Sequence, residues 1–366
     1  MKNIKKIFLS CLSVVATLLL IELSFRFYGY VKNIDFNVYL NDLTSSNRLP
    51  PEIFDDQKKQ YVLLKPNVQA LATTSDFSVI YKANNIGIRD KNYQLNKDQN
   101  KTRVVLLGDS FTFGEGVPEE KRFSDVLEKN LENLEVINFG MPGYGLDTIV
   151  ILYEQVAKNY QPDFVMVAIN FLDTQRNFSD IYHNGQVDLS QAKILGTSVD
   201  NGTALLKKED LNIKKKIPFS SISYASSYLN YQIIKYSIFN KMEETDKKLW
   251  SNLRLYLDKK PTTEEEIYTN EKTISLLKFL KEKVENNGAK LIVINIDPEY
   301  SLDFIGEIIG KENYFNYQQK LDSYSKTNSL RFKYDFHFNS ETNQTIGEWL
   351  TTDFKELLAD KYQYHF

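Results

Sequence analysis

The feature that most constrains the fold is an alternation of short apolar runs and amphipathic segments that begins at residue 103. The runs RVVLL (103–107), LEVINFG (134–140) and DFVMVAIN (163–170) have the length of strands and are rich in β-branched residues. Between them, residues 119–133 and 146–160 carry apolar residues at helical spacing. Strands that are apolar on both faces and alternate with helices predict a parallel sheet covered on both sides.

The same pattern returns near the end of the chain. Residues 264–286 have a strong amphipathic helical pattern, Gly288 is placed to end that helix, and AKLIVINI (289–296) predicts a fourth buried strand. Residues 329–360 then predict a short strand, a polar turn and a terminal helix. Four or five strands, each followed by a helix, describe a doubly wound sheet, whose ligands bind beyond the carboxyl ends of the strands.

The alternation is interrupted between the two stretches. We expect residues from about 171 to 270 to form an insertion with one helix over 223–242. Three tyrosines share a face of that helix, which is typical of an aromatic cap packed on the sheet domain and is also compatible with a platform that stacks on sugars. The insertion therefore predicts a helical cap.

The first residues of the chain differ from the rest. Three lysines precede an apolar run over 7–21, and Glu22 and Arg26 follow one helical turn apart. If the helix that begins with this run continues to Tyr28, it is just long enough for a hydrocarbon core of about 30 Å, so we expect residues 1–28 to form a membrane anchor. No cleavage site of the small-x-small kind follows the run, which favours an uncleaved membrane anchor over a signal peptide. The lysines before the run predict that the rest of the chain lies outside the cytoplasm.

Residues 29–100 are polar and irregular. The stretches LPPE and KPN mark turns, and FSVIYKANNIGIRD (77–90) predicts a strand that runs into a glycine turn. We expect a stalk and a small hairpin here, followed by a sheet domain over 101–366 that contains the insertion.

Composition excludes several classes of function. The net charge is −3, with 45 basic and 48 acidic residues interspersed, so no broad basic face is available for nucleic acid. Cys11 is the only cysteine, which rules out a disulfide within the chain and a zinc site made of cysteines. Three histidines, His183, His337 and His365, argue against a histidine-rich metal site.

Polar residues follow the predicted strands where ligands of such sheets bind. They are Gly108, Asp109 and Ser110 after the first strand, Gly140, Pro142, Gly143 and Gly145 after the second, Asn170 and Asp173 after the third, and Asp335, Phe336 and His337 after the last. Each has an ordinary structural explanation as well. Serine often caps a helix, glycine supplies positive φ angles in turns, an asparagine can order a loop, and a histidine at a helix start can be exposed.

Together these residues meet the different needs of one reaction. A serine hydroxyl becomes a nucleophile when a base takes its proton, which His337 can do, and Asp335 can fix the tautomer of the imidazole and stabilise its cation. The backbone N–H groups of Ser110 and Gly143 and the amide of Asn170 can donate to the oxyanion of a tetrahedral intermediate. The pattern indicates acyl chemistry at a serine.

In this order, Gly108-Asp109-Ser110, Gly143, Asn170 and Asp335/His337 resemble the four sequence blocks of the SGNH (GDSL) hydrolase family. With its apolar N-terminal segment and the stretches NNIGIRD, GDSFTFGEGV and NFGMPGYGLDT, the chain resembles the membrane-anchored bacterial branch in particular. The resemblance covers residues 103–170 and 290–358. It implies a flavodoxin-like three-layer α/β/α sandwich, Ser110 as the nucleophile, His337 as the base, Gly143 and Asn170 as oxyanion donors, and no cofactor.

Two blocks depart from the family pattern. The third usually reads Gly-x-Asn-Asp, whereas here Phe171 follows Asn170 and the next acid is Asp173, so Asn177 is an alternative donor. The last is most often Asp-x-x-His, whereas one residue separates Asp335 from His337. The motif Gly-x-Ser-x-Gly is absent, which argues against the α/β-hydrolase fold.

We therefore expect a serine ester hydrolase of the cell envelope, attached to the membrane by its N-terminal helix or secreted after signal cleavage. The expected substrates are O-acyl groups on envelope or extracellular glycans, released through an acyl-enzyme without a metal or other cofactor. An O-acyltransferase acting on a surface polysaccharide is an alternative, because the same triad serves when a sugar hydroxyl replaces water. A non-catalytic glycan-binding scaffold with the same fold is a third hypothesis.

Overall fold

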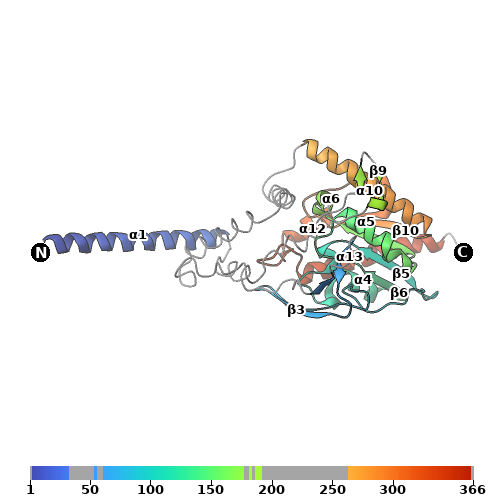
Figure 1. Ribbon diagram of the computed structural model, residues 1–366, viewed down its shortest axis with the longest axis horizontal. Helices are drawn as coiled ribbons and strands as arrows, with labels where there is room; N and C mark the ends of the chain where they lie inside the picture. The colour runs from blue at the N-terminus through green and yellow to red at the C-terminus, as the bar shows by residue number, and fades with distance from the viewer. Residues whose placement is uncertain are drawn as a thin grey trace. The chain divides into compact units, whose positions relative to one another are not determined.

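The computed structural model describes residues 2–32, 53–55, 61–176, 181–183, 186–191 and 263–363 (Figure 1). These residues fall into two units. Helix α1 (Lys2–Lys32) belongs to one unit, and nearly all the other described residues belong to a domain built around a five-stranded sheet.

The central sheet is parallel throughout. Its strands are β5 (Thr102–Leu107), β6 (Leu134–Asn138), β7 (Phe164–Ile169), β10 (Lys290–Asn295) and β11 (Tyr314–Asn316). They pair in the order β11-β10-β7-β5-β6, with every neighbouring pair parallel. Taken in chain order the arrangement is 2-1-3-4-5, which is the flavodoxin-like order. The predicted α/β fold with a central parallel sheet is therefore confirmed.

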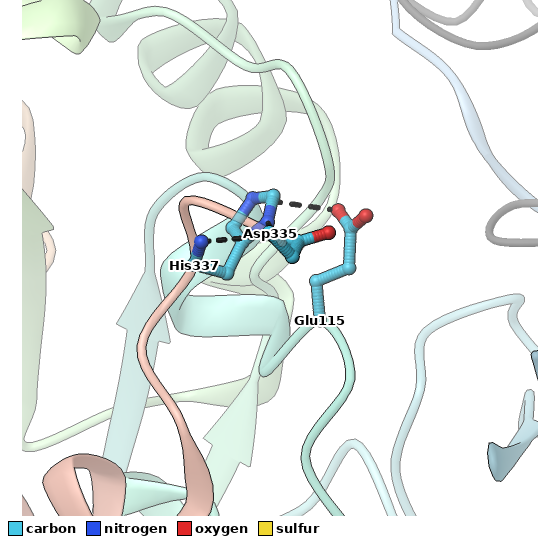
Figure 2. A group of neighbouring side chains, drawn as sticks. All are labelled: Glu115, Asp335 and His337. Carbon is cyan, nitrogen blue, oxygen red and sulfur yellow. Dashed lines mark hydrogen bonds and ion pairs between the residues drawn. The ribbon is translucent and has the colours of Figure 1, made fainter. Parts of the chain in front are cut away.

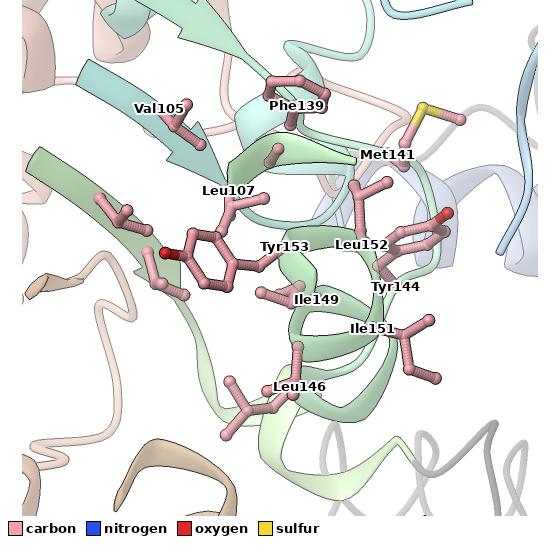
Figure 3. Close-up of a cluster of buried hydrophobic side chains, with 14 of the residues drawn as sticks. Val105, Leu107, Phe139, Met141, Tyr144, Leu146, Ile149, Ile151, Leu152 and Tyr153 are labelled. Carbon is pink, nitrogen blue, oxygen red and sulfur yellow. The ribbon is translucent and has the colours of Figure 1, made fainter. Parts of the chain in front are cut away.

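Helices cover both faces of this sheet. They are α5 (Leu146–Gln155) and α10 (Thr263–Asn286) on one face, and α4 (Phe123–Asn130) and α13 (Ser340–Gln363) on the other. Alternate residues of each strand enter different cores, so Val105 and Leu107 pack with Ile149 of α5, as Figure 3 shows. Val104 packs instead with Leu127 of α4 and with residues of α13. Burying such a side chain stabilises the fold by about 1.5–3 kcal/mol. The buried strands therefore hold the loops at their ends in defined positions.

The predicted helices and strands of the sheet domain are present, with shorter ends. Residues Glu119–Lys121 form a 3-10 turn, so α4 begins only at Phe123, and a second 3-10 turn, Ala157–Tyr160, follows the end of α5 at Gln155. Gly288, with φ +78°, ends α10 as expected.

The last strand is not the one that the sequence predicted. The fifth strand of the sheet is β11, between α11 (Phe304–Ile309) and α12 (Gln318–Ser325), and the segment before Asp335 forms only an isolated bridge from Arg331 to Phe338. β11 has three half-buried residues at the sheet edge, which is too short for an apolar pattern to appear. Asp335 and His337 consequently lie on a loop before α13 rather than at the end of a sheet strand.

Residues 61–72 and 76–100, which are part of the predicted stalk and hairpin region, belong to the same unit as the sheet. They contain β2 (Leu63–Leu64), which pairs with β1 (Phe54–Asp55), and the predicted hairpin of β3 (Gln69–Thr73) and β4 (Ser78–Lys82). Leu63, Leu64 and Ile88 are buried in the same cluster as Val105. The segment is therefore an integral part of the domain.

The N-terminal segment and the insertion are only partly described. α1 covers the predicted apolar helix and carries an ion pair between Arg26 Nε and Glu22 Oε1 at 2.8 Å. Among the described helices, none combines the length and the apolar character needed to cross a membrane, so the predicted membrane anchor is unsupported. The predicted cap helix over 223–242 lies outside the described residues; α6 (Phe171–Gln175) and the short hairpin of β8 (Tyr182–His183) and β9 (Gln186–Val187) lie within them.

Candidate active site

Ser110 lies at the start of a short helix at the carboxyl end of β5, an interior strand of the sheet. This helix is α3 (Ser110–Phe113), and Asp109 is its cap, with Oδ1 accepting a hydrogen bond from Phe111 N at 2.9 Å. Ser110 is therefore not needed as a cap. Its Oγ lies 2.7 Å from Nε2 of His337, and its side chain is almost completely buried. The cap of the helix and the candidate nucleophile are therefore two adjacent residues, Asp109 and Ser110.

Asp335 binds His337 at two points through one carboxylate oxygen. Oδ1 accepts a hydrogen bond from the backbone N–H of His337 at 2.9 Å and lies 2.7 Å from ring Nδ1 (Figure 2). An ionised carboxylate can only accept, so Nδ1 carries the hydrogen and Nε2 is the acceptor for the hydroxyl of Ser110. The short Asp-x-His spacing therefore makes a local turn that orients the imidazole.

Aromatic packing fixes the imidazole as well. The ring centroid of His337 lies 4.1 Å from that of Phe336 and 5.0 Å from that of Phe111. Phe338 packs edge-on against Phe111 at 4.7 Å. Because His337 is only 2% exposed, these contacts restrict its rotation, and the base is held in place towards Ser110.

Two of the predicted oxyanion donors, Gly143 and Asn170, lie on the loops that follow β6 and β7. Gly143 has φ +78°, a conformation that favours glycine, in the loop after β6. That loop lies directly against α3, since a Cβ placed on Gly140 would be 2.3 Å from Phe113 N and Met141 N donates to Gly108 O at 3.1 Å. The loop that carries Gly143 therefore contacts the segment that carries Ser110.

Asn170 both orders its loop and contacts the nucleophile segment. It caps α6, with Oδ1 accepting a hydrogen bond from Leu172 N at 2.9 Å, and its Nδ2 donates to Asp109 Oδ2 at 3.2 Å. The contact with Asp109 uses one of the two amide hydrogens. Asn170 thus lies beside the residue that precedes Ser110. The alternative donor Asn177 lies outside the described residues.

One arginine that the sequence analysis missed ties three of these loops together. Arg176 Nη1 donates to Asp109 Oδ2 at 3.0 Å, to Asp173 Oδ1 at 3.2 Å and to the carbonyl of Tyr144 at 3.0 Å. Burial raises the pKa of Asp173 well above its ordinary value, the neighbouring carboxylate of Asp109 raises it further, and Arg176 opposes both. Because its partners come from separate loops, only the fold reveals this role.

A second arginine gives a role to the stretch NNIGIRD. Arg89 is buried, and it donates through Nη1 to Phe113 O at 2.9 Å and to Gly114 O at 2.7 Å, and through Nη2 to Val117 O at 2.7 Å. Its guanidinium also lies 4.4 Å from the ring centroid of Tyr81. Burial lowers the pKa of Arg89 to about 10, which leaves it charged at neutral pH. The segment before β5 therefore fixes the turn that follows α3.

Two groups of described side chains have ligand atoms close enough to share one metal ion. They are Asp90, Glu119 and Asp125, and Glu115, Asp335 and His337. In the first group Arg122 supplies the positive charge, with Nε 2.7 Å from Asp125 Oδ2. In the second, the ring nitrogens of His337 already face Asp335 and Ser110. The donors of both groups are thus engaged within the protein.

No family model matches the chain, and no curated protein matches it. Similar solved structures include a putative lipolytic protein of the G-D-S-L family from Desulfitobacterium hafniense DCB-2, with 14% identity and a TM-score of 0.31, covering 69% of this chain and 99% of that one. A lipase/acylhydrolase from Enterococcus faecalis shares 14% identity with a TM-score of 0.36, over 70% of this chain and 96% of that one. A catalytic mutant of an acetylxylan esterase from Geobacillus stearothermophilus shares 14% identity with a TM-score of 0.35, over 71% and 94%. Values this low leave the assignment of an activity to the geometry of the site.

Proposed function

We propose that the chain is a serine ester hydrolase of the SGNH type. The observation that carries the proposal is the continuous chain of contacts from Asp335 through His337 to Ser110, with both heavy-atom distances at 2.7 Å. The nucleophile and the base are far apart in the sequence, near the beginning and the end of the sheet domain, so the fold brings them together. A hydroxyl, an imidazole and a carboxylate in this order are the groups that activate a serine.

The geometry supports an acyl-enzyme mechanism. As Ser110 Oγ attacks the acyl carbonyl, Nε2 of His337 takes the hydroxyl proton and Asp335 stabilises the imidazolium. The N–H groups of Ser110 and Gly143 and the amide of Asn170 are the proposed donors to the oxyanion, and losing one such donor typically costs about 10² to 10³ in kcat. Nε2–H then gives its proton to the leaving alcohol, and the acyl group remains on Oγ.

The proposed substrates are O-acyl groups on glycans outside the cytoplasm. The N-terminal sequence supports this location, because lysines precede an apolar run at the start of the chain. Fractionation of cells that make the full chain, followed by immunodetection, tests the location. Acetate or longer acids released from isolated envelope glycans by the enzyme, and not by Ser110→Ala, would identify the acyl group.

Labelling with a fluorophosphonate tests the enzyme proposal, because such a probe reacts with an activated serine. Wild type is compared with Ser110→Ala and His337→Ala, each checked for folding by its thermal midpoint. We expect labelling and turnover of a small activated ester by wild type only. Absence of both from folded wild-type protein would overturn the proposal and favour a non-catalytic scaffold.

Acyl transfer is a second candidate because the triad is shielded from solvent. Ser110 is 3% exposed and His337 is 2% exposed, and restricting water favours another acceptor for the acyl group. Incubation with an acyl donor and an acceptor glycan, followed by mass spectrometry of the products, distinguishes the two reactions. Free acid as the only product would leave hydrolysis as the activity.

A further inference from the structure

A buried glutamate lies next to the nitrogen that handles the protons of the reaction. Glu115 is 2% exposed, and its Oε2 lies 3.5 Å from Nε2 of His337 (Figure 2). The same Nε2 lies 2.7 Å from Ser110 Oγ. Burying a carboxylate costs free energy, so a glutamate at this position has a specific environment built around it.

The backbone holds Glu115 in register with the nucleophile. The flanking residues Gly114 and Gly116 have φ values of +74° and +76°, and Glu115 N donates to the carbonyl of Ser110 at 3.1 Å. Gly116 N donates to the hydroxyl of Tyr81 at 2.8 Å, and Arg89 binds the carbonyl of Gly114. These hydrogen bonds therefore hold the turn that carries Glu115 in a fixed position relative to Ser110.

The distance between Nε2 and Oε2 suits a bridging water. At 3.5 Å the two atoms are too far apart for a strong direct hydrogen bond, and a single water can touch both. Such a water would direct one hydrogen at Nε2 and the other at Oε2. Because Nε2 also lies 2.7 Å from Ser110 Oγ, such a water would be a neighbour of the atom that carries the acyl group.

We propose that Glu115 positions the water that hydrolyses the acyl-enzyme. The inference rests on the proposed esterase function and deepens it. The water oxygen bonds to the acyl carbon while one hydrogen passes to Nε2 of His337; the other stays on the oxygen and donates to Glu115. The bond from the acyl carbon to Ser110 Oγ then breaks, Oγ takes the proton from Nε2, and the free acid leaves. Formation of the acyl-enzyme uses no water, so Glu115 acts in the second half of the reaction.

An alcohol provides a contrasting acceptor. Methanol has a single hydroxyl hydrogen, which must go to Nε2, so it offers none to Glu115. Loss of the carboxylate therefore lowers hydrolysis more than methanolysis. The ratio of methyl ester to free acid becomes a readout that a general loss of structure would leave unchanged.

The experiment uses the full chain with p-nitrophenyl acetate under rapid mixing. The variants are Glu115→Ala and Glu115→Gln, with Glu120→Ala as the control, since Glu120 is an exposed glutamate close by in the chain. We expect the burst of p-nitrophenol to keep its rate within about threefold, while the steady-state rate falls by about 10 to 100-fold in Glu115→Ala. Intact-mass spectra should show the acetyl-enzyme accumulating, and added methanol should raise the ester-to-acid ratio at least several-fold.

Equal losses of the burst and steady-state rates, with an unchanged ratio of methyl ester to acid, would overturn the proposal and leave Glu115 a structural role. Glu115→Gln keeps an acceptor oxygen, so a smaller loss is expected, and it provides the same readouts if Glu115→Ala does not fold. A wild-type chain that releases no p-nitrophenol in a Ser110-dependent way would refute the proposed esterase function instead, so the two failures are distinguishable.

Discussion

The two halves of the candidate triad are held in different ways. Ser110 follows β5, an interior strand that pairs with strands on both sides, and Arg89 binds the carbonyls of the turn behind Ser110. His337 lies on a loop attached by an isolated bridge and by Asp76, whose carboxylate accepts hydrogen bonds from Lys333 N and Tyr334 N at 3.2 and 2.8 Å. A strand of the sheet and a buried arginine hold the segment of the nucleophile, whereas the base lies on a loop outside the sheet. Substitutions that loosen the segment of Ser110 should therefore lower stability, whereas substitutions on the loop of His337 should lower activity.

The largest effect is expected on the side of the base. Asp335→Asn keeps the shape of the side chain but no longer selects the imidazole tautomer that accepts from Ser110. In serine enzymes such a change lowers kcat by about 10⁴-fold, and we expect a similar loss of ester turnover here. The thermal midpoint should move little, because Asp335 lies on a loop outside the sheet core. A loss of less than about tenfold would contradict the assigned role.

On the side of the nucleophile, we expect a large effect on stability. Arg89→Met removes three donated hydrogen bonds and leaves buried carbonyls without them. Urea unfolding should show a loss of about 2–4 kcal/mol in the free energy of unfolding. The control is Arg331→Met on the base loop, whose guanidinium is partly exposed and 3.9 Å from Glu299, and it should cost under about 1 kcal/mol. Equal losses in the free energy of unfolding for Arg89→Met and Arg331→Met would contradict the difference between the two parts of the triad.

A smaller effect should appear as a pH dependence of stability on the nucleophile side. Burial raises the pKa of Asp90 to about 7, against the opposing Arg122 and the hydrogen bond from Asn138 N. The folded chain then keeps a proton that the unfolded chain releases above about pH 4. The stabilisation from this group is complete below pH 4 and is lost as the pH rises through 7, by about 2 kcal/mol between pH 5 and 7.

Asp90→Asn cannot ionise, so its urea midpoint should vary less with pH over this range. Asp322→Asn, at an exposed aspartate, serves as the control. Only the slope is compared, because asparagine lacks one of the two acceptor oxygens that bind Lys91 N and Asn138 N. An unchanged slope in Asp90→Asn would show that the carboxyl is ionised in the fold.

The same contrast explains how much could be predicted from the sequence. Strands such as Phe164–Ile169 are buried on both faces, so their apolar runs predicted the sheet and the position of Ser110 after the carboxyl end of a strand. β11 is short and half-buried and left no such signal, which is why the strand before Asp335 was predicted wrongly. Asp335 and His337 were predicted from their place after that strand and from the chemistry that a serine nucleophile needs, and the strand before them is only an isolated bridge.

The contacts of the buried arginines could not be predicted from the sequence. Arg89, Arg103 and Arg122 are among the largest fully buried side chains, although interspersed charges usually indicate a solvated surface. The partners of Arg89 and Arg103 are carbonyls and a carboxylate supplied by other segments. Arg103, for example, donates to the carbonyls of Leu95 and Tyr160. A backbone carbonyl has no signature in the sequence, so neither the Arg89 contacts nor the position of Glu115 beside His337 could be anticipated.

Mapping the residue that reacts with a fluorophosphonate is the most direct test of the central claim. Trypsin cleavage after Arg103 and Lys121 releases a peptide of residues 104–121, in which Ser110 and Thr112 carry the only hydroxyl groups. The triad predicts one adduct per chain, on Ser110, which disappears in His337→Ala. An adduct on Thr112, an adduct elsewhere in the chain, or labelling of Ser110 that survives the loss of His337 would contradict it.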